Sequence, residues 1–435
     1  MYDLAIIGLG PAGLEAAQIA IKNGLKVIAF EKKDLGGTCL NVGCIPTKAI
    51  LHSSEVYSSL NKLSDIGISI QDGYSYDWQK ILERKNNIVS KFNKSLDLLL
   101  SKKITIIKAD AQIQISNNSI QIKAEDYLYQ AKNVIIATGS KSIELSNLKY
   151  DNDFVLSSDD LFSLNELPKS IAIIGSGAIG LEWAKILSDF DVEVKIIEKA
   201  SNLAPIMDID IQKRIERVLK LNKIQFFKDD FIKEVIGKKI ILNSNTEFEV
   251  DKILCAVGRK PILPRIILNE ADVELELNSD YSCQFENIYV VGDANKESML
   301  AHSASYQAKQ ILNKILFNKK IIKKPSPSVI YITPEIASIG AREQDIKDDN
   351  AYKIKKILIG ALAKSWCDNA NDGLVKIIIK DDFIVGAHIV SKDASSLISI
   401  FNILIDKKIP VSEIEDIIFP HPSLAEVVLE VLKND

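Results

Sequence analysis

Residues 3–31 read DLAIIGLGPAGLEAAQIAIKNGLKVIAFE, and this stretch decides the first part of the fold. An apolar run predicts a short buried strand, and the glycines Gly8, Gly10 and Gly13 follow it in the spacing GxGxxG. A helical stretch then leads to a second strand that ends at Glu31. The first glycine permits a tight turn, the second lets a pyrophosphate approach the helix N-terminus, and the third allows close packing of helix and strand. The stretch therefore predicts a βαβ unit that binds a dinucleotide.

The same design recurs at residues 171–198, which read IAIIGSGAIGLEWAKILSDFDVEVKIIE. The glycines are Gly175, Gly177 and Gly180, and Glu198 follows the third glycine at the spacing seen in the first copy. A lone GxGxxG is weak evidence, but two copies with matched acids indicate two dinucleotide sites. An acid at this position accepts hydrogen bonds from a ribose 2′-OH and repels a 2′-phosphate, so the second copy predicts NAD rather than NADP.

The composition is that of an ordinary globular protein. Of the 435 residues, 47% are hydrophobic and 26% are charged, which excludes disordered and fibrous classes. The net charge of −4 is small and has the wrong sign for a nucleic-acid or membrane-surface protein. No apolar run approaches the roughly 18 residues of a membrane span, and no signal segment precedes the first strand. We therefore expect a soluble intracellular protein with neither a nucleic acid nor a membrane as partner.

The rest of the chain divides into further predicted elements. Residues 78–100 have the periodicity of an amphipathic helix, and residues 104–113 with 119–124 predict a hairpin or small sheet. A basic, Pro/Ser-rich stretch at 319–328 predicts a linker, and residues 329–435 mix strand and helix signals as a separate α+β domain. Buried strands that end in glycine turns are predicted at 133–140, 252–259 and 287–293.

Two cysteines stand close together in GGTCLNVGCIPTKAIL, residues 36–51. Intracellular proteins rarely keep structural disulfides, so Cys39 and Cys44 indicate redox chemistry, and the alternative is two buried free thiols. A zinc site is disfavoured and no metal is predicted, because zinc takes four ligands and no second cluster exists. Lys48 would share a helix face with Cys44 and favour its thiolate, unless it is a solvated surface lysine. The remaining cysteines are interpreted as inert: Cys255, Cys283 and Cys367.

One histidine stands out from the other three. His421 precedes a predicted terminal helix between two prolines, and Glu426 is close enough to orient its imidazole. A histidine held by a carboxylate is a typical general base, whereas the alternative is a rigid helix entry. The others are interpreted as structural: His52, His302 and His388.

These motifs resemble those of the FAD-dependent pyridine nucleotide–disulfide oxidoreductases. The residues 36–51 resemble the redox-disulfide signature of that family, and the resemblance extends over nearly the whole chain. The further matching segments are ATGS at 137–140, VGRKP at 257–261, IYVVGDA at 288–294, LAH at 300–302, YITPEIASIG at 331–340 and HPSLAE at 421–426.

The resemblance implies roles for individual residues. Cys44 would be the charge-transfer thiol beside the flavin, Cys39 would exchange with substrate, and Lys48 would pair with Glu182. His421, oriented by Glu426, would act as general base from the partner subunit. The implied FAD-binding residues are Gly8, Gly10, Gly13, Glu31, Gly37, Thr38, Lys48, Ala111, Thr138, Gly139, Ser140, Asp293 and Ala301, and those for NAD are Gly175, Gly177, Gly180, Glu198 and Gly258.

The resemblance also implies the architecture. The expected fold class is α/β, with two Rossmann-like dinucleotide-binding domains and a C-terminal α+β dimerisation domain. The expected boundaries place a first FAD-binding part at 1–145, an NAD-binding domain at 146–258, a second FAD-binding or central part at 259–324 and an interface domain at 325–435. Each subunit of a homodimer would hold one tightly bound FAD and use NAD+/NADH.

The implied activity is oxidation of dihydrolipoyl groups by NAD+, with lipoylated proteins and the acyltransferase core of 2-oxo acid dehydrogenase complexes as partners. One alternative is another NAD(P)H-dependent flavoprotein disulfide reductase, similar to glutathione reductase. A second is an assembly subunit whose flavin core is structural. The expected compartment is a bacterial cytosol, or the mitochondrial matrix for a processed organellar protein.

Overall fold

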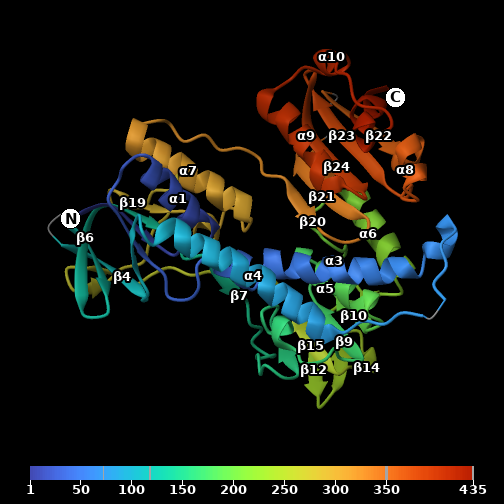
Figure 1. Ribbon diagram of the computed structural model, residues 1–435, viewed down its shortest axis with the longest axis horizontal. Coiled ribbons are helices and arrows are strands. Elements are labelled where there is room, and N and C mark those ends of the chain that lie inside the picture. The colour runs from blue at the N-terminus through green and yellow to red at the C-terminus, as the bar shows by residue number, and fades with distance from the viewer. Residues whose placement is uncertain (72, 117–118, 348–350, 434–435) are drawn as a thin grey trace.

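The first βαβ unit forms as the glycine pattern predicts. The structure is a computed structural model that describes residues 1–71, 73–116, 119–347 and 351–433. Strand β1 (Tyr2–Ile7), helix α1 (Pro11–Lys22) and strand β2 (Val27–Phe30) follow one another, and the two strands pair in parallel. Helix α7 (Ala301–Phe317) packs beside α1, as Figure 1 shows.

The glycines are required by close backbone approach. Gly8 has a φ of +97°, and a Cβ on Gly13 would lie 1.9 Å from the Gly8 carbonyl oxygen. The second copy repeats this geometry, because Gly175 has a φ of +98° and a Cβ on Gly180 would lie 2.1 Å from the Gly175 oxygen. Both turns therefore exclude side chains at these positions.

The sheet of the first unit has nine strands. Strands β19, β6, β1, β2 and β3 are parallel neighbours, and β4, β5 and β6 form an antiparallel meander that β17 and β18 extend. The bounds are β3 Thr105–Ile107, β4 Ala111–Ser116, β5 Ser119–Ala124, β6 Tyr127–Ile136, β17 Ile266–Leu268, β18 Ala271–Asp272 and β19 Ile288–Val290.

The hairpin or small sheet expected from residues 104–113 and 119–124 forms within one larger sheet. Strands β4 and β5 do pair antiparallel, but β3 leaves the hairpin and joins β2 in parallel. The physical reason is the long helical connection between β2 and β3, since such a crossover returns the chain in the parallel direction.

The second unit repeats the design with strand β9 (Ser170–Ile174), helix α5 (Ala178–Asp189) and strand β10 (Glu193–Ile197). Its five-stranded parallel sheet has the order β11-β10-β9-β15-β8, and β12, β13 and β14 form a small antiparallel sheet. The bounds of the other elements are β8 Val155–Leu156, α6 Ile209–Leu221, β11 Gln225–Phe227, β12 Ile232–Ile236, β13 Lys239–Leu242, β14 Glu247–Glu249 and β15 Lys252–Cys255.

In the part of the connection between β2 and β3 that the structure describes, there are three α-helices. They are α2 (Gly37–Asn41), α3 (Cys44–Leu60) and α4 (Trp78–Leu100), and the amphipathic helix predicted at 78–100 is confirmed as α4. Helix α3 packs against both α4 and α5, so it lies between the two dinucleotide units (Figure 1). Among the described residues, no helix has the length and apolar character needed to cross a membrane.

The last unit follows the predicted linker. Residues 318–327 form no regular element and lead in an extended path from α7 to β20 (Figure 1). The unit is a five-stranded antiparallel sheet of order β20-β21-β24-β23-β22 with helices against it, which confirms the α+β expectation. The bounds are β20 Ser328–Ile330, β21 Glu335–Gly340, β22 Tyr352–Leu358, α8 Ala363–Cys367, β23 Leu374–Lys380, β24 Phe383–Ser391, α9 Ala394–Lys407, α10 Val411–Ile414 and α11 Val427–Lys433.

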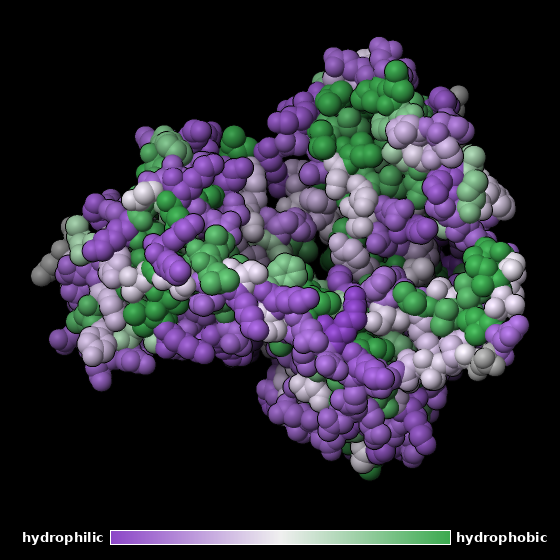
Figure 2. All heavy atoms as spheres, viewed as in Figure 1, coloured by the Kyte–Doolittle hydropathy of each residue, from purple (hydrophilic) through white to green (hydrophobic). Residues whose placement is uncertain are grey.

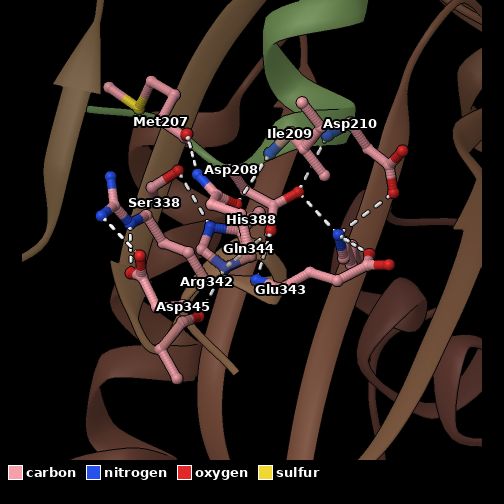
Figure 3. A network of polar contacts seen from close by, with 12 residues as sticks. Met207, Asp208, Ile209, Asp210, Ser338, Arg342, Glu343, Gln344, Asp345 and His388 are labelled. Carbon is pink, nitrogen blue, oxygen red and sulfur yellow. Dashed lines mark hydrogen bonds and ion pairs between the residues drawn. The ribbon is translucent and has the colours of Figure 1, made fainter. Parts of the chain in front are cut away.

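A buried polar junction joins the second unit to the C-terminal unit. Asp208, which caps α6, and Glu343 converge there, as Figure 3 shows. The ammonium of Lys376 on β23 lies 2.7 Å from Asp208 Oδ1 and also pairs with Asp210 and Glu343. The side chains of Lys376 and Asp208 are fully buried. The junction therefore joins these two units through a fully buried ion pair, with Asp210 and Glu343 at its partly exposed edge.

Candidate active site

The two cysteines lie at the junction of the short helix α2 and the longer helix α3. Cys39 is in α2, and Cys44 begins α3. Both are free thiols close enough for the Cys39 thiol to donate a hydrogen bond to the Cys44 sulfur. That hydrogen bond and the charge of Lys48 outweigh burial and lower the pKa of Cys44 to about 7, whereas the pKa of Cys39 is raised. One thiol is therefore poised to ionise and the other to stay protonated.

Lys48 stands one helical turn after Cys44 and is not a solvated surface lysine. Its Nζ lies 2.6 Å from Glu182 Oε2, and the Glu182 side chain is only 7% exposed. Glu182 belongs to α5 of the second unit, so the ion pair spans two units. The sequence resemblance implies this pair, and the structure brings its two members together.

Tyr331 also contacts this ion pair. Its backbone N–H donates to Glu182 Oε1 at 3.1 Å, and Lys48 Nζ lies 4.4 Å from the centre of its ring. Sequence reasoning placed Tyr331 in a motif but gave it no role. The only available signal was its place in the segment 331–340 that resembles the family, which says nothing about contacts with distant residues.

His421 and Glu426 form the predicted pair in the C-terminal unit. His421 Nδ1 lies 2.8 Å from Glu426 Oε1, and the other carboxylate oxygen accepts a hydrogen bond from the Ser423 N–H. These two hydrogen bonds lower the pKa of Glu426, the backbone one most. The His421 side chain is 72% exposed, and none of its hydrogen bonds among the described residues reaches the cysteines of its own chain.

The first glycine-rich turn opens onto a cavity of about 200 Å³. Gly8, Glu31, Ala111 and Thr138 contribute to its lining. Glu31 accepts hydrogen bonds from the N–H of Leu9 in the glycine-rich turn and from the N–H of Lys33, and a Cβ on Gly37 would lie 2.9 Å from Gly10 Cα. The residues present fit a dinucleotide, since the backbone leaves room for a pyrophosphate that side chains would fill.

A series of polar side chains lies at the pair of short strands β7 (Ser140–Ser142) and β16 (Arg259–Pro261). Ser140 in β7 donates to Asp293 Oδ2 at 2.5 Å and accepts from Arg259 Nε at 2.8 Å. Strand β16 pairs with β7 and carries Arg259, which sequence reasoning did not single out. Gly139 precedes this pair with a φ of +70°, and Ala301 begins α7. The Ser140 hydroxyl thus holds the Asp293 carboxylate in position.

The second glycine-rich turn has the same open backbone. Among the described residues, no atom outside the neighbouring backbone lies within 4 Å of a Cβ built on Gly177, so space for a phosphate remains at the start of α5. Glu198 Oε2 accepts hydrogen bonds from the N–H and hydroxyl of Ser176, and Oε1 accepts from the Ala200 N–H. Gly258, with a φ of +112°, follows strand β15, which lies beside this turn.

The other cysteines and histidines lie away from these groups. Burial raises the pKa of Cys255 to about 12 and also raises that of Cys283, whereas Cys367 is exposed. His388 belongs to the polar junction, where its ring nitrogens contact Ser338 Oγ and the Ala341 carbonyl oxygen (Figure 3). His302 contacts the Pro327 carbonyl oxygen, and His52 is exposed.

The fold and site define a class of protein. Two dinucleotide-binding turns, with a redox-capable cysteine pair beside an ion pair between them, are the parts of a nucleotide-dependent disulfide oxidoreductase. Residues 2–308 match the family described as pyridine nucleotide-disulphide oxidoreductase, and residues 326–432 match its dimerisation domain. The chain belongs to this family, whose members use a flavin and a pyridine nucleotide.

Among its curated relatives are dihydrolipoyl dehydrogenases. That of Mycoplasma pneumoniae is 32% identical over 452 residues, which cover 100% of this chain and 98% of the relative. One from Bacillus subtilis is 33% identical over 447 residues, which cover 99% of this chain and 97% of the relative. Two solved structures share the fold over 99% of both chains. One is LpdA from Mycobacterium tuberculosis, with a TM-score of 0.89 and 20% sequence identity. The other is the flavoprotein disulfide reductase RclA from Escherichia coli, with a TM-score of 0.85 and 23% sequence identity.

Proposed function

We propose that this chain is a dihydrolipoyl dehydrogenase, which oxidises dihydrolipoyl groups with NAD+ through a Cys39–Cys44 disulfide. The observation that carries the proposal is the thiol pair with unequal pKa values beside the Lys48–Glu182 ion pair. The full-length likeness to dihydrolipoyl dehydrogenases supports the choice of substrate.

We infer the thiol exchange from the chemistry of these groups. His421 Nε2 removes a proton from one dihydrolipoyl thiol, while Glu426 holds Nδ1 and stabilises the imidazolium. The resulting thiolate attacks Cys39 Sγ, the Cys39–Cys44 bond breaks, and Cys44 leaves as a thiolate. The second dihydrolipoyl thiol then displaces Cys39, which releases the lipoyl disulfide and leaves the dithiol form of the enzyme.

Lys48 stabilises the leaving Cys44 thiolate, in agreement with the lowered pKa of that group. FAD, when bound, supplies the chemistry that takes the electron pair from the dithiol and passes it as hydride to NAD+. Glu31 and Asp293 would hold FAD, and Glu198 would hold the adenosine ribose of NAD. We assign NAD rather than NADP because the Glu198 carboxylate would repel a 2′-phosphate.

We place the active site between two copies of the chain, so that His421 of one subunit serves Cys39 of the other. The exposure of the C-terminal unit supports this assembly. Ile418, three residues before His421, is 94% exposed in the single chain, and Ile403 is 56% exposed. Figure 2 shows hydrophobic residues gathered on this unit. A soluble monomer rarely leaves such a surface uncovered.

Lipoylated proteins and the acyltransferase core of a 2-oxo acid dehydrogenase complex are the proposed partners. The alternative is a reductase of another disulfide, and Glu198 disfavours an NADP-dependent one of the glutathione-reductase type. The bacterial relatives favour a bacterial cytosol.

The test is NADH formation by the purified, yellow protein with dihydrolipoamide and NAD+, beside a Cys44→Ser variant. We expect turnover in the wild type and its loss in the variant. A flavin-loaded wild type without turnover would reject the substrate, and trials of other disulfides with NADH and NADPH would then identify the class of reductase.

A further inference from the structure

Tyr331 lies where all three units of the chain meet. It belongs to the C-terminal unit, between β20 and β21, and its backbone N–H donates to Glu182 Oε1 of the second unit at 3.1 Å. Its ring lies over the ammonium of Lys48 from the first unit, 4.4 Å from the ring centre. Glu182 thus uses one carboxylate oxygen for Lys48 and the other for Tyr331.

The segment around Tyr331 is anchored on both sides. Its neighbours Ile330 and Ile332 are buried in the core that also contains residues of α3 and α5. Two residues later, Thr333 Oγ1 donates to Glu55 Oε1 of α3 at 2.9 Å. The ring therefore has little freedom to leave the Lys48 ammonium.

The side chain of Lys48 is partly exposed, at 32%, so packing alone does not fix the position of its ammonium. The Glu182 carboxylate holds it from one side, and the electron-rich face of the Tyr331 ring holds it from another. Three neighbouring side chains act on the pKa of Cys44: the Cys39 thiol and the Lys48 ammonium lower it, and the Glu182 carboxylate raises it.

We propose that Tyr331 is a positioning residue for the active site: its ring holds the Lys48 ammonium where that charge stabilises the Cys44 thiolate. The C-terminal unit thereby sets the ionisation of a thiol in the first unit. The proposal rests on the proposed disulfide chemistry but not on the identity of the thiol substrate.

The test follows the Cys44 thiolate in the flavin-loaded dimer. The enzyme is reduced by two electrons with dithionite, and the charge-transfer absorbance between thiolate and flavin is titrated from about pH 5 to pH 9. The wild type is expected to titrate with a pKa of about 7. Tyr331→Leu and Tyr331→Met remove the aromatic face, and both are expected to raise the apparent pKa by roughly 0.5–1, which is a three- to tenfold loss of thiolate at lower pH.

Two variants serve as controls. Tyr331→Phe keeps the ring and is expected to titrate as the wild type does. Tyr352→Leu removes a ring that lies 4.6 Å from Lys380 Nζ within the sheet of the C-terminal unit, and it is also expected to leave the titration unchanged. Flavin content and circular dichroism establish that each variant is folded.

The proposal is overturned if both Tyr331→Leu and Tyr331→Met titrate like the wild type. It is also overturned if Tyr331→Phe shifts as far as they do, which would assign the effect to the hydroxyl. An equal pKa shift in Tyr352→Leu would also overturn it, because the shift would then come from a general destabilisation of the C-terminal unit. Because no thiol substrate is used, failure of this test is distinct from failure of the dihydrolipoamide assay.

Discussion

Replacing Lys376 by methionine would remove a buried positive charge from the polar junction and keep a side chain of similar length. The Lys376 ammonium lies 2.7 Å from Asp208 Oδ1 and 3.1 Å from Asp210 Oδ2, and the Lys376 and Asp208 side chains have no exposed surface. Burial alone would raise the pKa of Asp208, but hydrogen bonds from Lys376 and from the Glu343 N–H outweigh it and lower that pKa. In the variant, the hydrogen bond from Lys376 would be missing, so burial would raise the pKa of Asp208 with less opposition.

Removing one partner of a buried ion pair costs about 3–5 kcal/mol, because the other charge is left without its counter-ion. We expect Lys376→Met to lose that much of its free energy of unfolding at neutral pH. A second substitution, Asp208→Asn, should recover part of the loss by removing the stranded charge. The loss should also shrink at acid pH, where Asp208 of the variant takes up a proton.

The assay is guanidinium chloride unfolding of the flavin-loaded proteins at equal dimer concentration, followed by circular dichroism and flavin fluorescence. The matched control is Lys238→Met, which removes an exposed lysine that pairs with Asp251 at 2.8 Å and should change stability little. The reasoning would be refuted if Lys376→Met unfolded at the same denaturant concentration as the wild type, or if Lys238→Met lost as much.

Three further predictions concern single groups. His421→Ala should lower the rate of NADH formation from dihydrolipoamide by about 10²–10⁴-fold, and Glu426→Gln should lower it less. Reduction of the flavin by NADH should stay intact in both variants. Full turnover in His421→Ala would contradict the role of His421 as base. Burial lowers the pKa of His388 below its unfolded value of about 6.5. The unfolded chain therefore takes up a proton on His388 more readily than the folded chain, and the free energy of unfolding decreases as the pH falls below about 6.5. Melting temperatures should show a weaker pH dependence in His388→Gln but not in the exposed control His52→Gln, and equal curves would contradict this. Glu198→Ala should raise kcat/KM for NADP+ relative to NAD+ by roughly tenfold or more, because the repulsion of the 2′-phosphate is gone; an unchanged ratio would assign the preference to other residues.

Local chemistry made much of this protein predictable from its sequence. Gly8 and Gly13 could be recognised because a strand-to-helix turn that approaches its own backbone leaves no room for a Cβ. Residues 78–100 could be recognised as a helix because one face of it is apolar along its whole length. The parallel pairing of the strand at 105–107 with β2 could not be predicted, since it depends on a connection that local periodicity does not describe.

The sequence by itself determined the two nucleotide turns, the cysteine pair and the His421–Glu426 pair, because each depends on residues a few positions apart. Only the tertiary structure decided the surroundings of the thiols. Lys48 and Glu182 are 134 positions apart, and Lys376 is 168 positions from Asp208. Tyr331 reaches Glu182 through its backbone N–H, a group that every residue except proline carries. Such contacts leave no pattern along the chain, because they arise from the packing of separate units against one another.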